Sequence, residues 1–207
     1  ADAQPLPTRL ADVSVEVTDE DGIQRAAPLF LVSPGQINFE VPEQTAPGRA
    51  TIVVRDMRTS QAVATYAVNI DDVAPGLFAA NQNGRNAAAA VAVWVKPDNS
   101  QTWQVTFQCS GGLGSCLATP LAMGAESDKL YLYLYGTGIR GRSGLGAVRA
   151  TIGGTTASVE YAGPAPGFVG LDQVNVLVPK SLAGRLDVPV VLTVEGKASN
   201  TVTVSFQ

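Results

Sequence analysis

The chain has 207 residues and a net charge of −4; 45% of its residues are hydrophobic, 15% are charged and none is histidine. This composition predicts a globular protein, and because basic runs are missing we expect neither a nucleic-acid partner nor insertion into a membrane. Histidine is the commonest general base and a common metal ligand, so its absence argues against most enzymes and metal sites, and we expect no cofactor.

Short strands separated by turn residues account for the first third of the chain. Residues 1–9 predict an extended N-terminal arm that Pro5 and Pro7 stiffen. The segments that follow alternate apolar and polar residues, as half-buried strands do. The expected strands are Val13–Val17, Ala27–Val32, Pro34–Pro42, Ala50–Arg55 and Ala62–Ile70. The turn-forming segment Asp71–Gly76 then marks a domain boundary.

The remainder has the same character, and no segment shows a sustained helical period. Lys129–Tyr135, KLYLYLY, places three leucines on one face of a strand and three tyrosines on the other. The other expected strands are Ala87–Val95, Thr102–Cys109, Val148–Ile152, Ala157–Tyr161, Gly170–Pro179, Val188–Glu195 and Thr201–Phe206. An all-β chain of short strands with regular turns predicts sandwiches or barrels.

One strand pattern occurs twice, as PGQINFEVP at Pro34–Pro42 and as GLDQVNVLVP at Gly170–Pro179. Gln36 and Asn38 correspond to Gln173 and Asn175, each pair 137 positions apart. In both copies the apolar residues alternate with these amides, so one face of each strand is expected to support a core. We interpret the amides as structural groups that satisfy nearby backbone, and a binding site is the alternative. The chain therefore predicts two related β-units.

The order of motifs resembles a known family. The second half carries YGTG, a TIGG hairpin, APGFVGLDQVNVLVP and VPVVLTVEGKASNTVTV, and the first half carries LFLVSPGQINFEVP, PGRATIVV and APGLF. This wording is similar to the Solibacter-type C-terminal domain family, whose repeats lie at the ends of large exported bacterial proteins. The resemblance implies immunoglobulin-like sandwiches, secretion and a modular, non-catalytic role, and it supplies no catalytic residues. It does not extend to residues 79–128.

We therefore expect two tandem immunoglobulin-like β-sandwich domains, the second enlarged by an insertion. After the arm at 1–9, the first sandwich occupies 10–72, a linker occupies 73–78, and the second sandwich occupies 79–207 with its insertion at about 79–128. The first sandwich lacks a strand to match Lys129–Gly138, which the resemblance places before Val13–Val17. The arm, the insertion or a strand from a neighbouring molecule could cover the edge that this leaves.

The two cysteines, Cys109 and Cys116, flank the loop SGGLGS and are too few for a cysteine zinc site. We expect a disulfide between them, with two free thiols as the alternative; closing so short a loop would stabilise the fold by roughly 2 kcal/mol. A disulfide indicates an oxidising compartment and therefore export. Ala1–Ala3 has the small-x-small form of a signal-peptide cleavage site.

Three further groups of side chains have both a functional and a structural interpretation. Trp94 and Trp103 lie on one expected hairpin and could form a platform for a sugar ring, although a tryptophan in a sandwich more often belongs to the core. The acidic loops Asp19–Asp21 and Asp71–Asp72 are weak calcium candidates, and a solvated turn or linker is the simpler interpretation. No other metal ligands are expected.

From these observations we expect a secreted, non-catalytic structural or assembly module of a bacterial cell-surface protein or extracellular fibre. Its partners would be copies of itself in a head-to-tail arrangement, or other surface proteins. The alternative is a carbohydrate-binding module that holds a glycan on the Trp94–Trp103 hairpin. No nucleophile elbow and no paired carboxylates indicate an enzyme.

Overall fold

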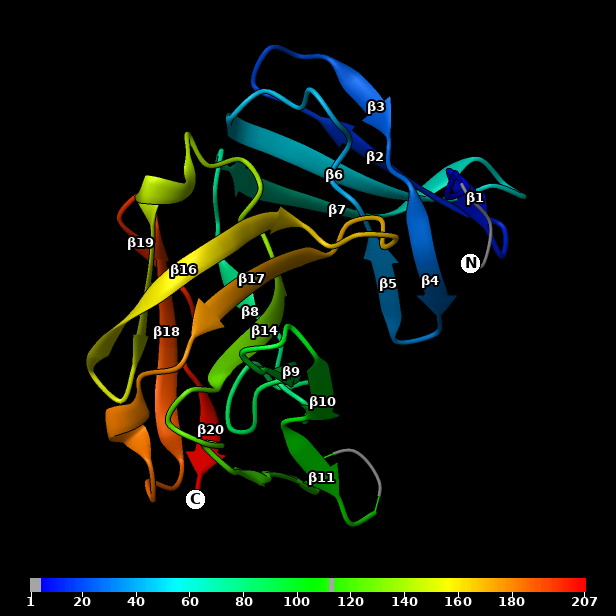
Figure 1. Ribbon diagram of the computed structural model, residues 1–207. Coiled ribbons are helices and arrows are strands. Elements are labelled where there is room, and N and C mark those ends of the chain that lie inside the picture. The colour runs from blue at the N-terminus through cyan, green and yellow to red at the C-terminus, as the bar shows by residue number, and fades with distance from the viewer. Residues whose placement is uncertain (1–4, 112–113) are drawn as a thin grey trace. The chain divides into compact units, whose positions relative to one another are not determined.

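The computed structural model describes residues 5–111 and 114–207, and nearly all of its regular structure is strand (Figure 1). The prediction of an all-β chain is confirmed. The described helical segments are the short 3-10 turns η1 (Leu145–Ala147) and η2 (Lys180–Leu182), neither of which has the length or hydropathy to cross a membrane. The chain divides into two compact units, Ala1–Asp72 and Val73–Gln207.

The first unit has two sheets. The larger sheet has the order β1-β2-β6-β7, with β3 paired to β2, and the smaller sheet is the hairpin β4-β5. The bounds are β1 Arg9–Leu10, β2 Val13–Thr18, β3 Gln24–Ala26, β4 Leu29–Ser33, β5 Gln36–Phe39, β6 Gly48–Asp56 and β7 Gln61–Ile70. Five buried residues from β2, β4, β6 and the β3–β4 connection form its core: Val15, Val17, Ala27, Leu29 and Ala50.

The second unit contains one continuous sheet with the order β10-β9-β14-β17-β16-β15-β18-β20-β13, and β8 and β19 pair at its sides. The bounds are β8 Gly76–Leu77, β9 Ala90–Val95, β10 Gln101–Val105, β11 Phe107–Cys109, β12 Cys116–Ala118, β13 Pro120–Leu121, β14 Lys129–Thr137, β15 Val148–Ile152, β16 Thr155–Pro164, β17 Asp172–Leu177, β18 Val188–Val194, β19 Lys197–Ala198 and β20 Val202–Phe206. β11 and β12 pair with each other separately.

The two halves of this long sheet enclose a single core. Leu130, Leu132 and Leu134 of β14 are at most 1% exposed, and Val174 and Val176 of β17 are fully buried. The alternating valines and leucines of β18 and β20 belong to the same cluster. Figure 1 shows the β16–β17 pair running obliquely to β18, so the sheet turns within β16 and brings its two halves together.

The two units repeat one pattern of strand pairing. In the first unit β2 pairs with β3 and β6, β4 pairs with β5, and β6 pairs with β7. In the second unit β15 pairs with β16 and β18, β16 pairs with β17, and β18 pairs with β20, all antiparallel as in the first unit. β5 therefore corresponds to β17, and β3 with β4 corresponds to the single long strand β16.

The expected linker at 73–78 is wrong, because this segment belongs to the second unit. Val73 and Leu77 are 2% and 3% exposed in its core, and β8 pairs with the end of β14. The glycines of the YGTG motif permit this approach: a Cβ on Gly136 would collide with the carbonyl oxygen of Gly76, and one on Gly138 with that of Ala74. The boundary therefore falls between Asp72 and Val73.

One expected strand begins later than predicted and another is interrupted. Ala27–Val32 begins at Leu29, because the buried Ala27 and Pro28 form the connection between β3 and β4. Thr102–Cys109 is broken at Thr106, which is fully buried and donates its hydroxyl to the carbonyl oxygen of Ala88. Residues 79–128 are also built into the second unit, since β9 extends the sheet beyond β14 and β13 pairs in parallel with β20.

Candidate functional site

The open edge of β5 distinguishes this strand from its counterpart in the second unit. In the second unit β17 lies between β16 and β14 and has a neighbour on both sides. Its counterpart β5 pairs with β4 alone among the strands of residues 5–111 and 114–207. Within the described part of the chain, β5 therefore has no neighbour that corresponds to β14.

The peptide groups that face this edge can be identified from the repeat. The amide of Val178, immediately after β17, donates to the carbonyl oxygen of Leu130 at 2.8 Å, toward β14. The amide of Glu40 donates to the carbonyl oxygen of Pro28 at 2.9 Å, toward β4. Because successive peptide groups of a strand point to opposite sides, those of Ile37, Phe39 and Val41 point to the edge that β14 covers in the second unit.

An apolar groove with a volume of about 560 Å³ lies between β5 and the β6–β7 hairpin. Tyr66 pairs with Ile52 and therefore points to the inner face of its sheet, yet it is 59% exposed. None of the residues that line the groove carries a charge: Val15, Ser33, Pro34, Gly35, Gln36, Ile37, Phe39, Ile52, Val54, Val63, Ala64, Tyr66, Ala67 and Val68. An inner sheet face is thus left partly open to solvent.

The second unit shows what fills the equivalent space. Leu130, Leu132 and Leu134 project from β14 into the core, and Leu132 lies opposite Val176. Val176 corresponds to Phe39, which is only half-buried. The described residues of the first unit, 5–72, therefore supply neither the backbone partner nor the row of large aliphatic side chains that β17 receives from β14.

The described part of the N-terminal arm lies elsewhere. The carbonyl oxygen of Pro7 accepts a hydrogen bond of 2.8 Å from the amide of Leu29 in β4, and Leu6 is 9% exposed. Leu29 lies opposite Phe39, and its amide points away from β5, so this arm supports the far side of β4. The strands of the 79–128 segment pair within the second unit or with each other.

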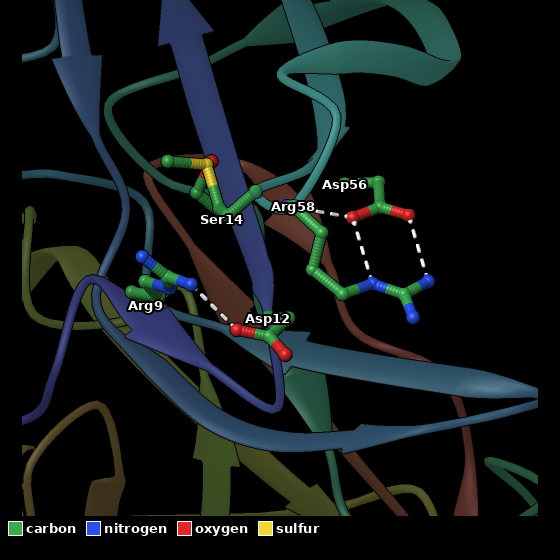
Figure 2. Close-up of polar contacts among 6 residues, drawn as sticks. Arg9, Asp12, Ser14, Asp56 and Arg58 are labelled. Carbon is green, nitrogen blue, oxygen red and sulfur yellow. Dashed lines mark hydrogen bonds and ion pairs between the residues drawn. The ribbon is translucent and has the colours of Figure 1, made fainter.

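A charged cluster borders one end of the groove. Arg58, just after β6, forms a two-pronged ion pair with Asp56, the last residue of β6 (Figure 2). Arg9 of β1 pairs with Asp12, which lies between β1 and β2. Hydrogen bonds from the Arg58 side chain hold the pKa of the Asp56 carboxyl below its ordinary value. Val63 lines both the groove and a shallow pocket beside these side chains. The ion pairs hold two neighbouring turns and leave the groove itself uncharged.

The repeated amides bond to each other. The Gln36 amide donates to the Asn38 side-chain oxygen at 2.7 Å, and Gln173 donates to Asn175 at the same distance. Residues two apart on a strand share one face, which explains the pairing. These side chains are exposed in the first unit and half-buried in the second. The expectation that these amides bond to nearby backbone is therefore wrong for these bonds, and their structural role stays a prediction.

The expected disulfide between Cys109 and Cys116 is present. The two residues lie directly opposite each other in the β11–β12 pair, so the bond closes a short hairpin. Asn81 anchors this hairpin to the rest of the unit: its amide donates to the carbonyl oxygen of Cys116 and its oxygen accepts from the Cys116 amide, both at 2.8 Å.

The prediction that Trp94 and Trp103 form one platform is wrong. In the β9–β10 pair Trp103 lies opposite Val93, and Trp94 lies opposite Thr102. Directly opposed residues share a face and neighbours alternate, so the two indoles point to opposite faces of the hairpin. Trp94 packs against the core and donates its indole N–H to the carbonyl oxygen of Ala122, whereas Trp103 is 72% exposed.

Neither acidic loop forms a cation site in the described residues. Asp19 is buried, and its carboxylate accepts from the amides of Ile23 and Ala46 and pairs with Arg25. Those contacts occupy both of its oxygens. Asp71 and Asp72 are exposed, and no group of three or more acidic or cysteine side chains gathers anywhere among residues 5–111 and 114–207.

Comparison with models of protein families and with curated proteins finds no match to this chain. The resemblance to the Solibacter-type family therefore stays a prediction. The open edge of β5 with its apolar groove is the feature of this molecule that most requires a partner.

Proposed function

We propose that this chain is an exported, non-catalytic structural module that assembles by accepting a β-strand from a neighbouring polypeptide. One observation carries the proposal: in the part of the chain that the structure describes, no strand lies beside β5 and its groove at the place where β14 lies in the second unit. An unpaired apolar edge is a template for another strand, and proteins use such edges for strand addition.

Several features support an exported, immunoglobulin-like module. The Cys109–Cys116 disulfide is of the kind that persists in oxidising compartments. Antiparallel sheets around a shared core, with the same pairing pattern in both units, are in keeping with tandem immunoglobulin-like sandwiches. The family resemblance points the same way and places such repeats on bacterial surface proteins or extracellular fibres.

The proposed contact also favours extended assemblies. The acceptor edge lies in the first unit, so a donor strand elsewhere on a second copy makes a contact between different surfaces. Contacts of that kind join molecules head to tail and continue into filaments unless the rotation closes a ring. A fibre or surface layer is therefore the assembly that this chemistry supports best.

The test is assembly of the purified chain, followed by sedimentation velocity and electron microscopy over a range of concentrations. We expect concentration-dependent oligomers that Tyr66→Glu abolishes, because the substitution places a charge in the apolar groove at a side chain that is already 59% exposed. Thr65→Glu is the matched control, since the neighbouring side chain points to the outer face of β7.

A chain that stays monomeric at every concentration would contradict assembly between copies. Equal loss of assembly in Tyr66→Glu and Thr65→Glu would point to a contact on some other surface. The circular dichroism spectra of both variants should match that of the parent, which shows that the variants are folded and that a loss of assembly is not a loss of folding.

A further inference from the structure

We propose that the strand which fills the β5 groove is β10 of a second copy of this chain. This inference rests on the proposed function and names its partner and its contact surface. β10 (Gln101–Val105) is the outermost strand of the second unit, where it pairs with β9 alone among the described strands. Its residues are all exposed, including Trp103 at 72% and Val105 at 46%.

β10 lacks the devices that normally protect a sheet edge. Its sequence, QTWQV, has no charge and no proline, and its register with β9 is regular over all five residues. Natural sheets block such edges with lysine, proline, bulges or covering segments. The β5 edge, QINF, is also unprotected by charge, and so is the outer edge of β7, whose side chains line the groove itself. Among the described residues of the second unit, β10 is an uncharged edge without a partner.

The backbone of β10 presents hydrogen-bonding groups with the spacing that β5 needs. The amide of Thr106 donates to the carbonyl oxygen of Ala90 at 3.1 Å, toward β9. By alternation the peptide groups of Gln101, Trp103 and Val105 point away from β9 to the open edge. On β5 the outward groups are those of Ile37, Phe39 and Val41, so each edge offers alternate residues over a span of five.

The side chains of β10 are equally suited to the groove. Gln101, Trp103 and Val105 share one face with Val91, Val93 and Val95 of β9. Val93, directly opposite Trp103, is already buried at 5% exposure, so the open part of this face is that of β10 itself. The opposite face of β9 supplies Ala90 and Ala92 to the core of its own unit. The face with Trp103 and Val105 is therefore the one available to a second copy, and it presents large apolar side chains to an uncharged groove.

The proposed contact repeats an arrangement that the chain already contains. In the second unit β17 pairs with β14, and β14 pairs with β9, each antiparallel. With β10 of a neighbour beside β5, the order β4-β5-β10-β9 would follow the order β16-β17-β14-β9. A folded copy keeps β14 between β17 and β9, so β14 is not free to act as the donor.

The contact joins two different edges, and this permits a test by mixing two variants. Tyr66→Glu disables the groove but leaves β10 intact, and Trp103→Lys disables β10 but leaves the groove intact. Each variant alone should be monomeric. An equimolar mixture should form a one-to-one dimer and nothing larger, because one good groove and one good β10 remain and the other two edges are blocked.

One control variant, one exchange measurement and one further variant accompany the mixture. Thr102→Lys changes the neighbouring exposed residue on the opposite face of β10 and should assemble as the parent does. Hydrogen exchange measured by mass spectrometry should show protection of the 37–41 and 101–105 segments on assembly. Val105→Pro removes one outward amide, and we expect it to weaken the contact about tenfold, the effect of one lost hydrogen bond.

Three outcomes would overturn the proposal. Trp103→Lys would assemble like the parent if another segment were the donor, which would refute β10 while leaving strand addition intact. A mixture that stays monomeric although each variant is folded would exclude this pairing of edges. Assembly that protects 101–105 but not 37–41 would place the contact between two β10 edges.

Discussion

Asp19 is a buried carboxylate that holds three segments of the first unit together. It accepts from the amide of Ala46, before β6, and from that of Ile23 in the β2–β3 turn, and it pairs with Arg25 of β3. These contacts favour the charged form, and the hydrogen bond from Ala46 contributes most to a pKa below the ordinary value of 3.8. The folded state therefore binds this proton less readily than the unfolded chain does.

This pKa shift makes the stability of the first unit depend on acid. A carboxylate whose folded pKa is lowered stabilises fully above its unfolded pKa, and that stabilisation is lost as the pH falls below about 4 toward the folded value. Asp19→Asn should be less stable at neutral pH and should show a weaker decrease between pH 5 and 2. Hydrogen exchange of the intact protein in increasing denaturant, read from peptides of the first unit at each pH, measures the stability of both proteins. If the stability of Asp19→Asn falls with pH in parallel with that of the parent, Asp19 is not the group responsible.

The repeated amide pair provides a comparison inside one molecule. Asn175 lies between Tyr133 and Tyr161 on neighbouring strands and is half-buried, whereas Asn38 is exposed. Asn175→Ala should therefore cost about 0.5–1.5 kcal/mol of unfolding free energy. Asn38→Ala should cost less than about 0.5 kcal/mol, because water replaces the lost bond at a surface site. Equal costs would show that burial does not set the value of this pair.

At the scale of the element, β14 buries large side chains beside β17, and no described strand does the same beside β5. Leu132 is fully buried opposite Val176, and Leu132→Ala should destabilise the second unit by roughly 2–5 kcal/mol through lost burial and a cavity. Phe39, which corresponds to Val176, is only half-buried beside an open groove. Phe39→Ala should cost the free monomer about 1 kcal/mol, since only half of the side chain leaves water.

Assembly should change that comparison. If a neighbouring strand covers the groove, Phe39 becomes fully buried, and Phe39→Ala should then weaken the assembled form more than the monomer. Unfolding measured below and above the assembly concentration separates the two costs. A cost that does not depend on concentration would mean that Phe39 lies outside the contact.

At the scale of the molecule, the two units have unequal cores. Among the described residues, five are buried in the core of the first unit and 28 in that of the second. Hydrophobic stabilisation scales with the apolar area removed from water, so the monomer should unfold in two steps, the first unit before the second. Hydrogen exchange in increasing denaturant assigns each step, and assembly should raise the first step alone. A single cooperative transition would contradict independent units.

Much of the architecture could be read from local pattern. Alternation predicted nearly all of the strands, since a strand with one buried face requires a period of two whatever its neighbours are. The repeat of PGQINFEVP and GLDQVNVLVP predicted two related units, and their strand pairings correspond. The spacing of Cys109 and Cys116 predicted their disulfide, because a short loop brings its own ends together without help from the rest of the fold.

What only the tertiary structure decided were the neighbours of each strand and the direction of each side chain. Trp94 and Trp103 point to opposite faces because Trp94 lies opposite Thr102, and a register shift of one residue would have placed the two indoles on the same face. The segment 73–78 joined the second unit because Gly136 of β14 and Gly138 just after it admit its backbone, a contact between residues about 60 apart in the sequence. The open groove beside β5 has the same origin, since pairing between distant strands depends on which partners are present and not on the strand itself.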